Sequence, residues 1–211
     1  MKFPKCDNTP LGIYPVVDRA YKLTSLYEVG ITTAQLRTKD KFSGQALEDE
    51  VIEAIKISEK FNARFFLNDF WELGIKHKAY GIHLGQEDIL EADISAICDA
   101  GIRLGISTHT TDEIQIALDI EPSYVAIGPI FETNSKKMVY DPVGIEDLKR
   151  WSNSVAYPIV AIGGINLDTI SDVVATNAAN GLAMIAGVLK NDEVSEKKTK
   201  ALIEIFEKAS K

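Results

Sequence analysis

The sequence has very little cysteine and no apolar run long enough to cross a membrane. Cys6 and Cys98 are the only cysteines in 211 residues, and they form no Cys-x-x-Cys pair. This pattern excludes a disulfide-stapled scaffold and is typical of a reducing compartment. A transmembrane helix needs about 20 consecutive apolar residues, and residues 1–10 lack the apolar segment of a signal peptide. We therefore expect a cytoplasmic protein without a membrane partner.

Positive charge and histidine are also scarce. Lysine and arginine number 23 against 31 aspartates and glutamates, which gives a net charge of −8. This balance argues against a dedicated nucleic-acid-binding protein, because any positive patch must be local. The histidines, His77, His83 and His109, lack the spacing of a zinc site. We expect them to be structural or to shape a substrate pocket.

Eight short apolar runs recur along the chain, and segments with helical spacing separate them. This alternation predicts a parallel sheet, because each parallel strand needs a crossover connection. It predicts the α/β class and a single-domain (β/α)8 TIM barrel over residues 1–211, with residues 1–10 as an amino-terminal arm. A doubly wound open sheet is the alternative, but no Gly-x-Gly-x-x-Gly turn opens the first helix, and polar residues follow nearly every strand. The runs cover residues 12–17, 33–36, 64–67, 81–84, 103–106, 124–127, 158–162 and 181–185.

Polar side chains follow the second predicted strand. Gln35, Arg37 and Lys39 stand at alternate positions, so strand periodicity places them on one side, toward the mouth of the barrel if Leu36 packs against the helices. Three polar groups at that place favour an anionic or polar ligand. For Arg37 alone, a structural ion pair with a neighbouring carboxylate is the alternative.

Two carboxylates follow the next two predicted strands. Asn68 and Asp69 come after the third run, and Asp88 comes shortly after the fourth. Because the ends of adjacent strands meet at one rim of a barrel, we expect both carboxylates in one region. Mg²⁺ takes one or two protein carboxylates and completes its shell with water and substrate phosphate oxygens. The pair is therefore a candidate magnesium site, although each aspartate could instead cap the helix that follows it.

Hydroxyl groups and a lysine follow the fifth and sixth predicted strands. Ser107 lacks the histidine and carboxylate context of a hydrolase, so we expect it to form hydrogen bonds to a ligand or, equally, to cap a helix. The loop over residues 128–144 carries Thr133, Ser135 and Lys136. These groups suit a phosphate, and the lysine would stabilise developing negative charge. A solvated surface loop is the alternative, which the length of the loop makes less favourable.

The last two predicted strands end in small residues. Gly163 and Gly164 follow the seventh strand, and Ile185 and Ala186 close the eighth. Glycine lets backbone N–H groups approach phosphate oxygens closely, and phosphate sites of such barrels often form here. A tight turn without a ligand is the alternative. With the metal region, this gives two anionic pockets that would fit two phosphorylated substrates.

Taken in order, these motifs resemble the thiamine-phosphate synthase family. QLRTK, NDF, HLGQED, GIST, GPIFETNSKK and AIGGI follow one another between residues 12 and 187. The resemblance implies a Mg²⁺-dependent transferase that joins 4-amino-2-methyl-5-(diphosphooxymethyl)pyrimidine to 4-methyl-5-(2-phosphooxyethyl)thiazole and releases diphosphate. It also implies dissociative substitution, in which C–O cleavage leaves a pyrimidine methylene cation that the thiazole nitrogen captures.

The resemblance also implies residue roles. Arg37, Lys136 and Ser107 would be catalytic, with Ser107 at the aminopyrimidine. The pyrimidine diphosphate would contact Gln35, Arg37, Lys39, Asn68 and Lys136, and Asp69 and Asp88 would hold Mg²⁺. The thiazole phosphate would contact Thr133, Ser135, Gly164 and the Ile185 and Ala186 backbone. The family often has serine where Ala186 stands, so only a backbone N–H would meet the phosphate there.

Three other functions fit parts of the pattern. A thiazole tautomerase on the same fold would lack the full metal and diphosphate set, and a phosphosugar isomerase or epimerase would use a general acid and base without Mg²⁺. A regulatory barrel would bind phosphate without turnover. Small-molecule substrates are the expected partners, and the sequence leaves open a homo-oligomer.

Overall fold

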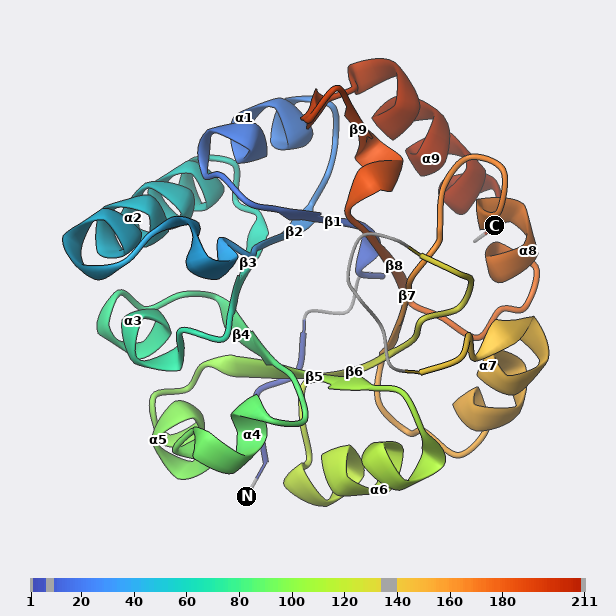
Figure 1. Ribbon diagram of the computed structural model, residues 1–211, viewed down its shortest axis with the longest axis horizontal. Helices are drawn as coiled ribbons and strands as arrows, with labels where there is room; N and C mark the ends of the chain where they lie inside the picture. Colours follow the sequence, from blue (N-terminus) through green and yellow to red (C-terminus); the bar gives the residue numbers. More distant parts are fainter. Residues whose placement is uncertain (1, 7–9, 134–139, 210–211) are drawn as a thin grey trace.

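A closed barrel of eight parallel strands forms the centre of the molecule, and helices surround it (Figure 1). The computed structural model describes residues 2–6, 10–133 and 140–209. Each strand pairs with its neighbours in sequence, and β1 closes the ring against β8 with Gly12 opposite Gly181. The predicted (β/α)8 barrel is thus confirmed, and the open sheet is excluded. The strands are β1 Gly12–Val17, β2 Thr33–Leu36, β3 Arg64–Asn68, β4 Gly81–Leu84, β5 Arg103–Thr108, β6 Tyr124–Ile127, β7 Ile159–Ile162 and β8 Gly181–Met184.

The crossovers are helical, as the apolar spacing predicted. None of the helices within the described residues is long and apolar enough to span a membrane. A short antiparallel pair, β9 Leu189–Lys190 and β10 Glu193–Val194, follows the barrel. The helices are α1 Tyr21–Glu28, α2 Gly44–Lys60, α3 Trp71–Lys76, α4 Asp88–Glu91, α5 Ile94–Asp99, α6 Thr111–Ile120, α7 Gly144–Ser152, α8 Ile170–Val174 and α9 Glu196–Ala209, with 3₁₀ turns η1 Lys39–Lys41 and η2 Ala186–Val188.

β1, β2, β4 and β6 have the predicted bounds, and each of the other four strands differs from its predicted run at one end by one or two residues. β7 begins at Ile159 because Pro158 has no N–H to donate to a neighbouring strand. β5 continues to Thr108, since Ser107 and Thr108 still pair with Ala126 and Ile127 of β6. This extension keeps Ser107 on a rigid strand.

The barrel interior holds large aromatic rings, and two glycines make room for them. Phe66 and Tyr124 are fully buried inside the barrel. Their aromatic rings lie edge to face at a centroid distance of 5.2 Å. A Cβ on Gly81 would lie 2.2 Å from the Phe66 ring, and one on Gly105 would lie 2.1 Å from the Tyr124 ring. Side chains at these two positions would therefore displace the rings that fill the barrel.

The amino-terminal segment packs under the amino ends of the strands. Phe3 and Cys6 are buried, and Cys6 contacts the aromatic interior. The Ser123 hydroxyl donates to the Pro4 carbonyl at 2.6 Å, and the Arg103 guanidinium donates to the Lys5 carbonyl at 3.0 Å. This segment closes one end of the barrel, so the interior opens at the carboxyl ends of the strands.

Candidate active site

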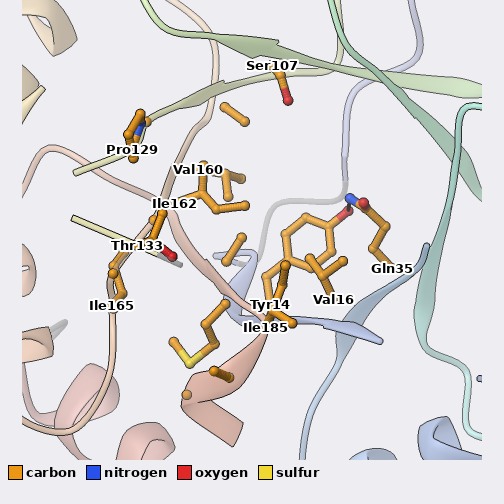
Figure 2. Close-up of a pocket in the computed structure, with 18 of the residues that line it drawn as sticks. Tyr14, Val16, Gln35, Ser107, Pro129, Thr133, Val160, Ile162, Ile165 and Ile185 are labelled. Atoms are coloured by element: carbon orange, nitrogen blue, oxygen red, sulfur yellow. Dashed lines mark hydrogen bonds between the residues drawn. The ribbon is translucent and has the colours of Figure 1, made fainter. Parts of the chain in front are cut away.

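A cavity of about 690 Å³ opens at the carboxyl ends of the strands. Every strand or the turn after it contributes lining residues. Figure 2 shows the Tyr14 hydroxyl beside Gln35, with Thr133 and Ile165 across the cavity from Gln35. Catalytic groups of such barrels come from this rim, because strand ends distant in sequence converge there.

Most of the predicted site residues line this single cavity. Lys39 does not line it, and Ser135 and Lys136 lie outside the described residues. The cavity brings together Gln35, Arg37, Asn68, Asp69, Asp88, Ser107, Thr133, Gly164, Ile185 and Ala186.

Strand alternation holds for Gln35 and Arg37 at the end of β2 and fails for Lys39. Leu36 is buried in the layer between strands and helices, so Gln35 and Arg37 face the cavity as predicted. β2 ends at Leu36, and Lys39 begins a 3₁₀ turn with φ of 52°. The alternation of side chains along the strand therefore ends before Lys39, whose side chain is exposed.

The two aspartates are placed by different local structures. Asp69 has φ of 65°, an uncommon backbone region for a residue other than glycine. It does not cap α3, because Phe70 occupies that position without a side-chain hydrogen bond. Asp88 accepts a hydrogen bond at 2.8 Å from the Gly85 N–H, which closes the turn before α4. Asp88 thus combines the predicted turn role with a place on the cavity wall.

Electrostatics link the two carboxylates and Arg37. Burial and then the charge of Asp88 raise the pKa of Asp69 from 3.8 to about 6, while Arg37 opposes the rise. Within the described residues, no group of three or more His, Cys, Asp or Glu side chains could hold a metal. Two mutually repelling carboxylates nevertheless fit Mg²⁺, which needs only one or two from the protein when a substrate phosphate completes its shell.

A row of five hydrogen-bonded side chains crosses the floor of the cavity, here called the polar row. Gln35 Nε2 donates to the Tyr14 hydroxyl at 3.3 Å, and the Tyr14 and Tyr124 hydroxyls lie 3.0 Å apart. His83 Nδ1 lies 2.7 Å from the Tyr124 hydroxyl, and His83 Nε2 lies 2.8 Å from Ser107 Oγ. Burial raises the pKa of both tyrosines well above 10, so both keep their hydrogens at neutral pH.

Ser107 therefore faces the cavity and does not cap a helix. The cap of α6 is Thr110, whose hydroxyl accepts a hydrogen bond from the Glu113 N–H at 3.2 Å. His83 and His109 line the cavity, in agreement with a pocket-shaping role. His77 instead contacts Glu48 at 2.5 Å, outside the cavity.

The glycine turn after β7 packs tightly against the segment after β6. Gly163 and Gly164 have φ of 101° and 69°, and a Cβ on either would lie 2.5–2.6 Å from Pro129 or Phe131. The positive φ values and the close packing of this turn therefore both require glycine here. The turn, Ile185 and Ala186 line one part of the cavity together with Lys198, whose ammonium donates to the Leu189 carbonyl at 2.9 Å.

Sequence reasoning missed several residues that line this cavity, among them Tyr14, Tyr124 and Lys198. Tyr14 and Tyr124 lie within apolar runs and carry the pattern of core residues, which they also are. Lys198 lies on α9, after the last strand. Only the alternation of Tyr14 with Ile13 in β1 gave a signal that its ring points into the barrel.

Fold and cavity together define a class: a (β/α)8 barrel with a polar, carboxylate-bearing site at the carboxyl ends of its strands. A family model described as thiamine monophosphate synthase matches residues 13–188. A thiamine-phosphate synthase from Proteus mirabilis (strain HI4320) is 46% identical over 198 residues, which are 93% of this chain and 91% of that protein. One from Photorhabdus laumondii subsp. laumondii is 48% identical over 181 residues, 85% of this chain and 83% of that protein.

A solved structure agrees with these relatives. A thiamine phosphate pyrophosphorylase from Pyrococcus furiosus superposes with a TM-score of 0.82 at 26% identity, covering 95% of this chain and 98% of that one. The chain belongs to the thiamine monophosphate synthase family. The resemblance found in the sequence motifs is thereby confirmed.

Proposed function

We propose that this chain is a cytoplasmic thiamine-phosphate synthase. It joins 4-amino-2-methyl-5-(diphosphooxymethyl)pyrimidine to 4-methyl-5-(2-phosphooxyethyl)thiazole and gives thiamine phosphate and diphosphate. The observation that carries the proposal is the convergence of ten residues with family-implied roles on one cavity. The family membership and the names of the relatives support the same reaction.

The chemistry demands stabilisation of a leaving group. In a dissociative substitution, the C–O bond breaks before the thiazole nitrogen attacks, so negative charge develops on the diphosphate. Arg37 lines the cavity beside Asp69 and is proposed to bind that charge together with Asn68 and Lys136. No general base is required, because the attacking nitrogen carries no proton.

The two carboxylates are the proposed magnesium ligands. Asp69 and Asp88 would hold Mg²⁺, which when bound supplies positive charge to the diphosphate oxygens. Without a cation, their mutual repulsion contributes to the raised pKa of Asp69.

The second substrate is proposed to bind at the other part of the cavity. Thr133 and Ser135 would offer hydroxyls to the thiazole phosphate, and Gly164, Ile185 and Ala186 would offer backbone N–H groups. The position of Thr133, Gly164, Ile185 and Ala186 on the wall of the same cavity supports this assignment. Ser107 and Gln35 are proposed to contact the aminopyrimidine.

The decisive experiment measures diphosphate release by the purified protein. Both thiamine precursors are supplied with and without Mg²⁺, and each substrate is omitted in turn. Release that requires both substrates and the metal is the expected result. Absence of release while thiamine phosphate still binds would indicate a tautomerase-like or regulatory relative, and turnover of a phosphosugar without Mg²⁺ would indicate an isomerase.

A further inference from the structure

Donors and acceptors in the polar row follow one order, which starts at Gln35. The side-chain nitrogen Nε2 of an amide only donates, so the Tyr14 hydroxyl accepts from it. A phenol has a single hydrogen, and the other partner of Tyr14 in the row is the Tyr124 hydroxyl. Tyr14 therefore donates to Tyr124.

The hydrogens of Tyr124, His83 and Ser107 take the same order as that of Tyr14. Tyr124 accepts from Tyr14, so its own hydrogen goes to His83 Nδ1 at 2.7 Å. Nδ1 must then be unprotonated, and the ring hydrogen of neutral His83 sits on Nε2. Nε2 donates to Ser107 Oγ at 2.8 Å, which leaves the Ser107 hydrogen directed away from His83. Ser107 lines the cavity, so that hydrogen is available to a ligand.

We propose that Tyr14, Tyr124 and His83 are positioning residues that hold Ser107 as a hydrogen-bond donor toward the cavity. The first bond of the row also commits the Gln35 amide nitrogen to Tyr14, which leaves the carbonyl Oε1 of Gln35 as an acceptor. The two ends of the row thus offer one donor and one acceptor.

This pattern selects the heterocycle, an inference that rests on the proposed function. A 4-aminopyrimidine carries an amino donor and ring-nitrogen acceptors, the complement of Gln35 Oε1 and the Ser107 hydroxyl. The corresponding 4-oxopyrimidine reverses the pattern, with a carbonyl acceptor beside a ring N–H donor. A site whose polar groups are held in one order rejects the reversed pattern, because donors would then face donors.

The first test needs no substrate and so does not depend on the proposed function. Nitrogen chemical shifts of ¹⁵N-histidine-labelled protein report which ring nitrogen carries hydrogen. The chain has three histidines, and His77→Gln and His109→Gln assign the remaining signal to His83. The expected result at pH 7.5 is a neutral His83 protonated at Nε2. An Nδ1-protonated or doubly protonated ring would overturn the proposal, since either reverses the bond to Tyr124.

The second test separates recognition from folding by enzyme kinetics. Tyr124→Phe keeps the buried ring and removes the hydroxyl that holds His83. We expect the KM for the pyrimidine diphosphate to rise about 10-fold, the loss of one neutral hydrogen bond, with the KM for the thiazole phosphate unchanged. Tyr27→Phe is the matched control, because Tyr27 loses a buried hydroxyl bond to Ser58 outside the cavity. It should leave both KM values unchanged.

Pyrimidine analogues give the readout that a purely structural role would not move. Wild type should discriminate against pyridine analogues in which one ring nitrogen is replaced by CH, and Ser107→Ala should lose that discrimination. Tyr124→Phe should lose most of it. Retained discrimination in Tyr124→Phe, or equal rises in both KM values, would refute the positioning role. If wild type released no diphosphate, the proposed function would fail, and the His83 signal would still decide the order of the polar row.

Discussion

Replacement of Asp69 by asparagine should make the protein more stable while it removes activity. Burial and the charge of Asp88 raise the pKa of this carboxyl to about 6 in the folded state, against 3.8 ordinarily. A folded-state pKa above the unfolded-state value favours folding while the group is protonated. That contribution is full below about pH 4 and is lost as the pH rises through about 6.

The size of the effect follows from the same values. A rise from 3.8 to about 6 corresponds to about 3 kcal/mol, at about 1.4 kcal/mol per pH unit. Asp69 is only partly buried, so solvent screening reduces this to about 1–2 kcal/mol. Asparagine also tolerates the positive φ of this position. Asp69→Asn should therefore be more stable than wild type by about 1–2 kcal/mol at pH 8 and equal to it at pH 4.

Urea unfolding in EDTA at pH 4, 6 and 8 measures this difference. Asp141→Asn, at an exposed position, is the matched control and should change stability by less than about 0.5 kcal/mol at each pH. The same Asp69→Asn protein should lose at least about 100-fold in kcat at saturating Mg²⁺, if this carboxylate binds the metal. Equal stability of variant and wild type at pH 8, or a gain that does not change with pH, would refute the electrostatic reasoning.

Three further variants test other parts of the site and the fold. Asp88→Asn should lower kcat by at least about 100-fold with an unchanged circular dichroism spectrum; unchanged turnover at saturating Mg²⁺ would remove Asp88 from the metal site. Lys136→Ala should lower kcat in steady-state assays, because the lysine is proposed to stabilise the departing diphosphate, and an effect on KM alone would assign it to ground-state binding. Gly105→Ala should destabilise the barrel by about 1–3 kcal/mol in urea unfolding, because its Cβ would lie 2.1 Å from the Tyr124 ring; an unchanged midpoint would show that the ring can move.

The barrel could be predicted because its signal is local and repeated. Residues 12–17 and 33–36 are strands with the predicted bounds, since their apolar runs end at polar residues or turns. The same reasoning placed Gln35 and Arg37 on the cavity side through the burial of Leu36. Periodicity does not indicate where a strand stops, so the prediction that Lys39 shares the cavity side with Gln35 and Arg37 is wrong.

Roles that depend on distant residues could not be predicted in this way. Tyr14 and Tyr124 are 110 positions apart, and nothing near either residue in the sequence indicates that their hydroxyls meet. The sequence around each tyrosine has the pattern of a core residue. That pattern predicts the burial of the ring correctly but does not indicate the partner of the hydroxyl. The pairing of β3 with β4 brings Asp88 near Asp69, as the strand order predicted, but the sequence did not indicate the burial that is the main cause of the raised pKa of Asp69.

The pairing of β1 with β8 has a consequence for how the chain is made. Gly12 pairs with Gly181, so one edge of β1 stays unpaired during synthesis until β8, near the end of the chain, has been made. Until then, both edges of the growing sheet expose unpaired backbone groups that can pair with other chains. Truncation after β7 would leave those edges open permanently. The barrel closes only when β8 pairs with β1. A fragment that lacks β8 therefore cannot form the closed sheet.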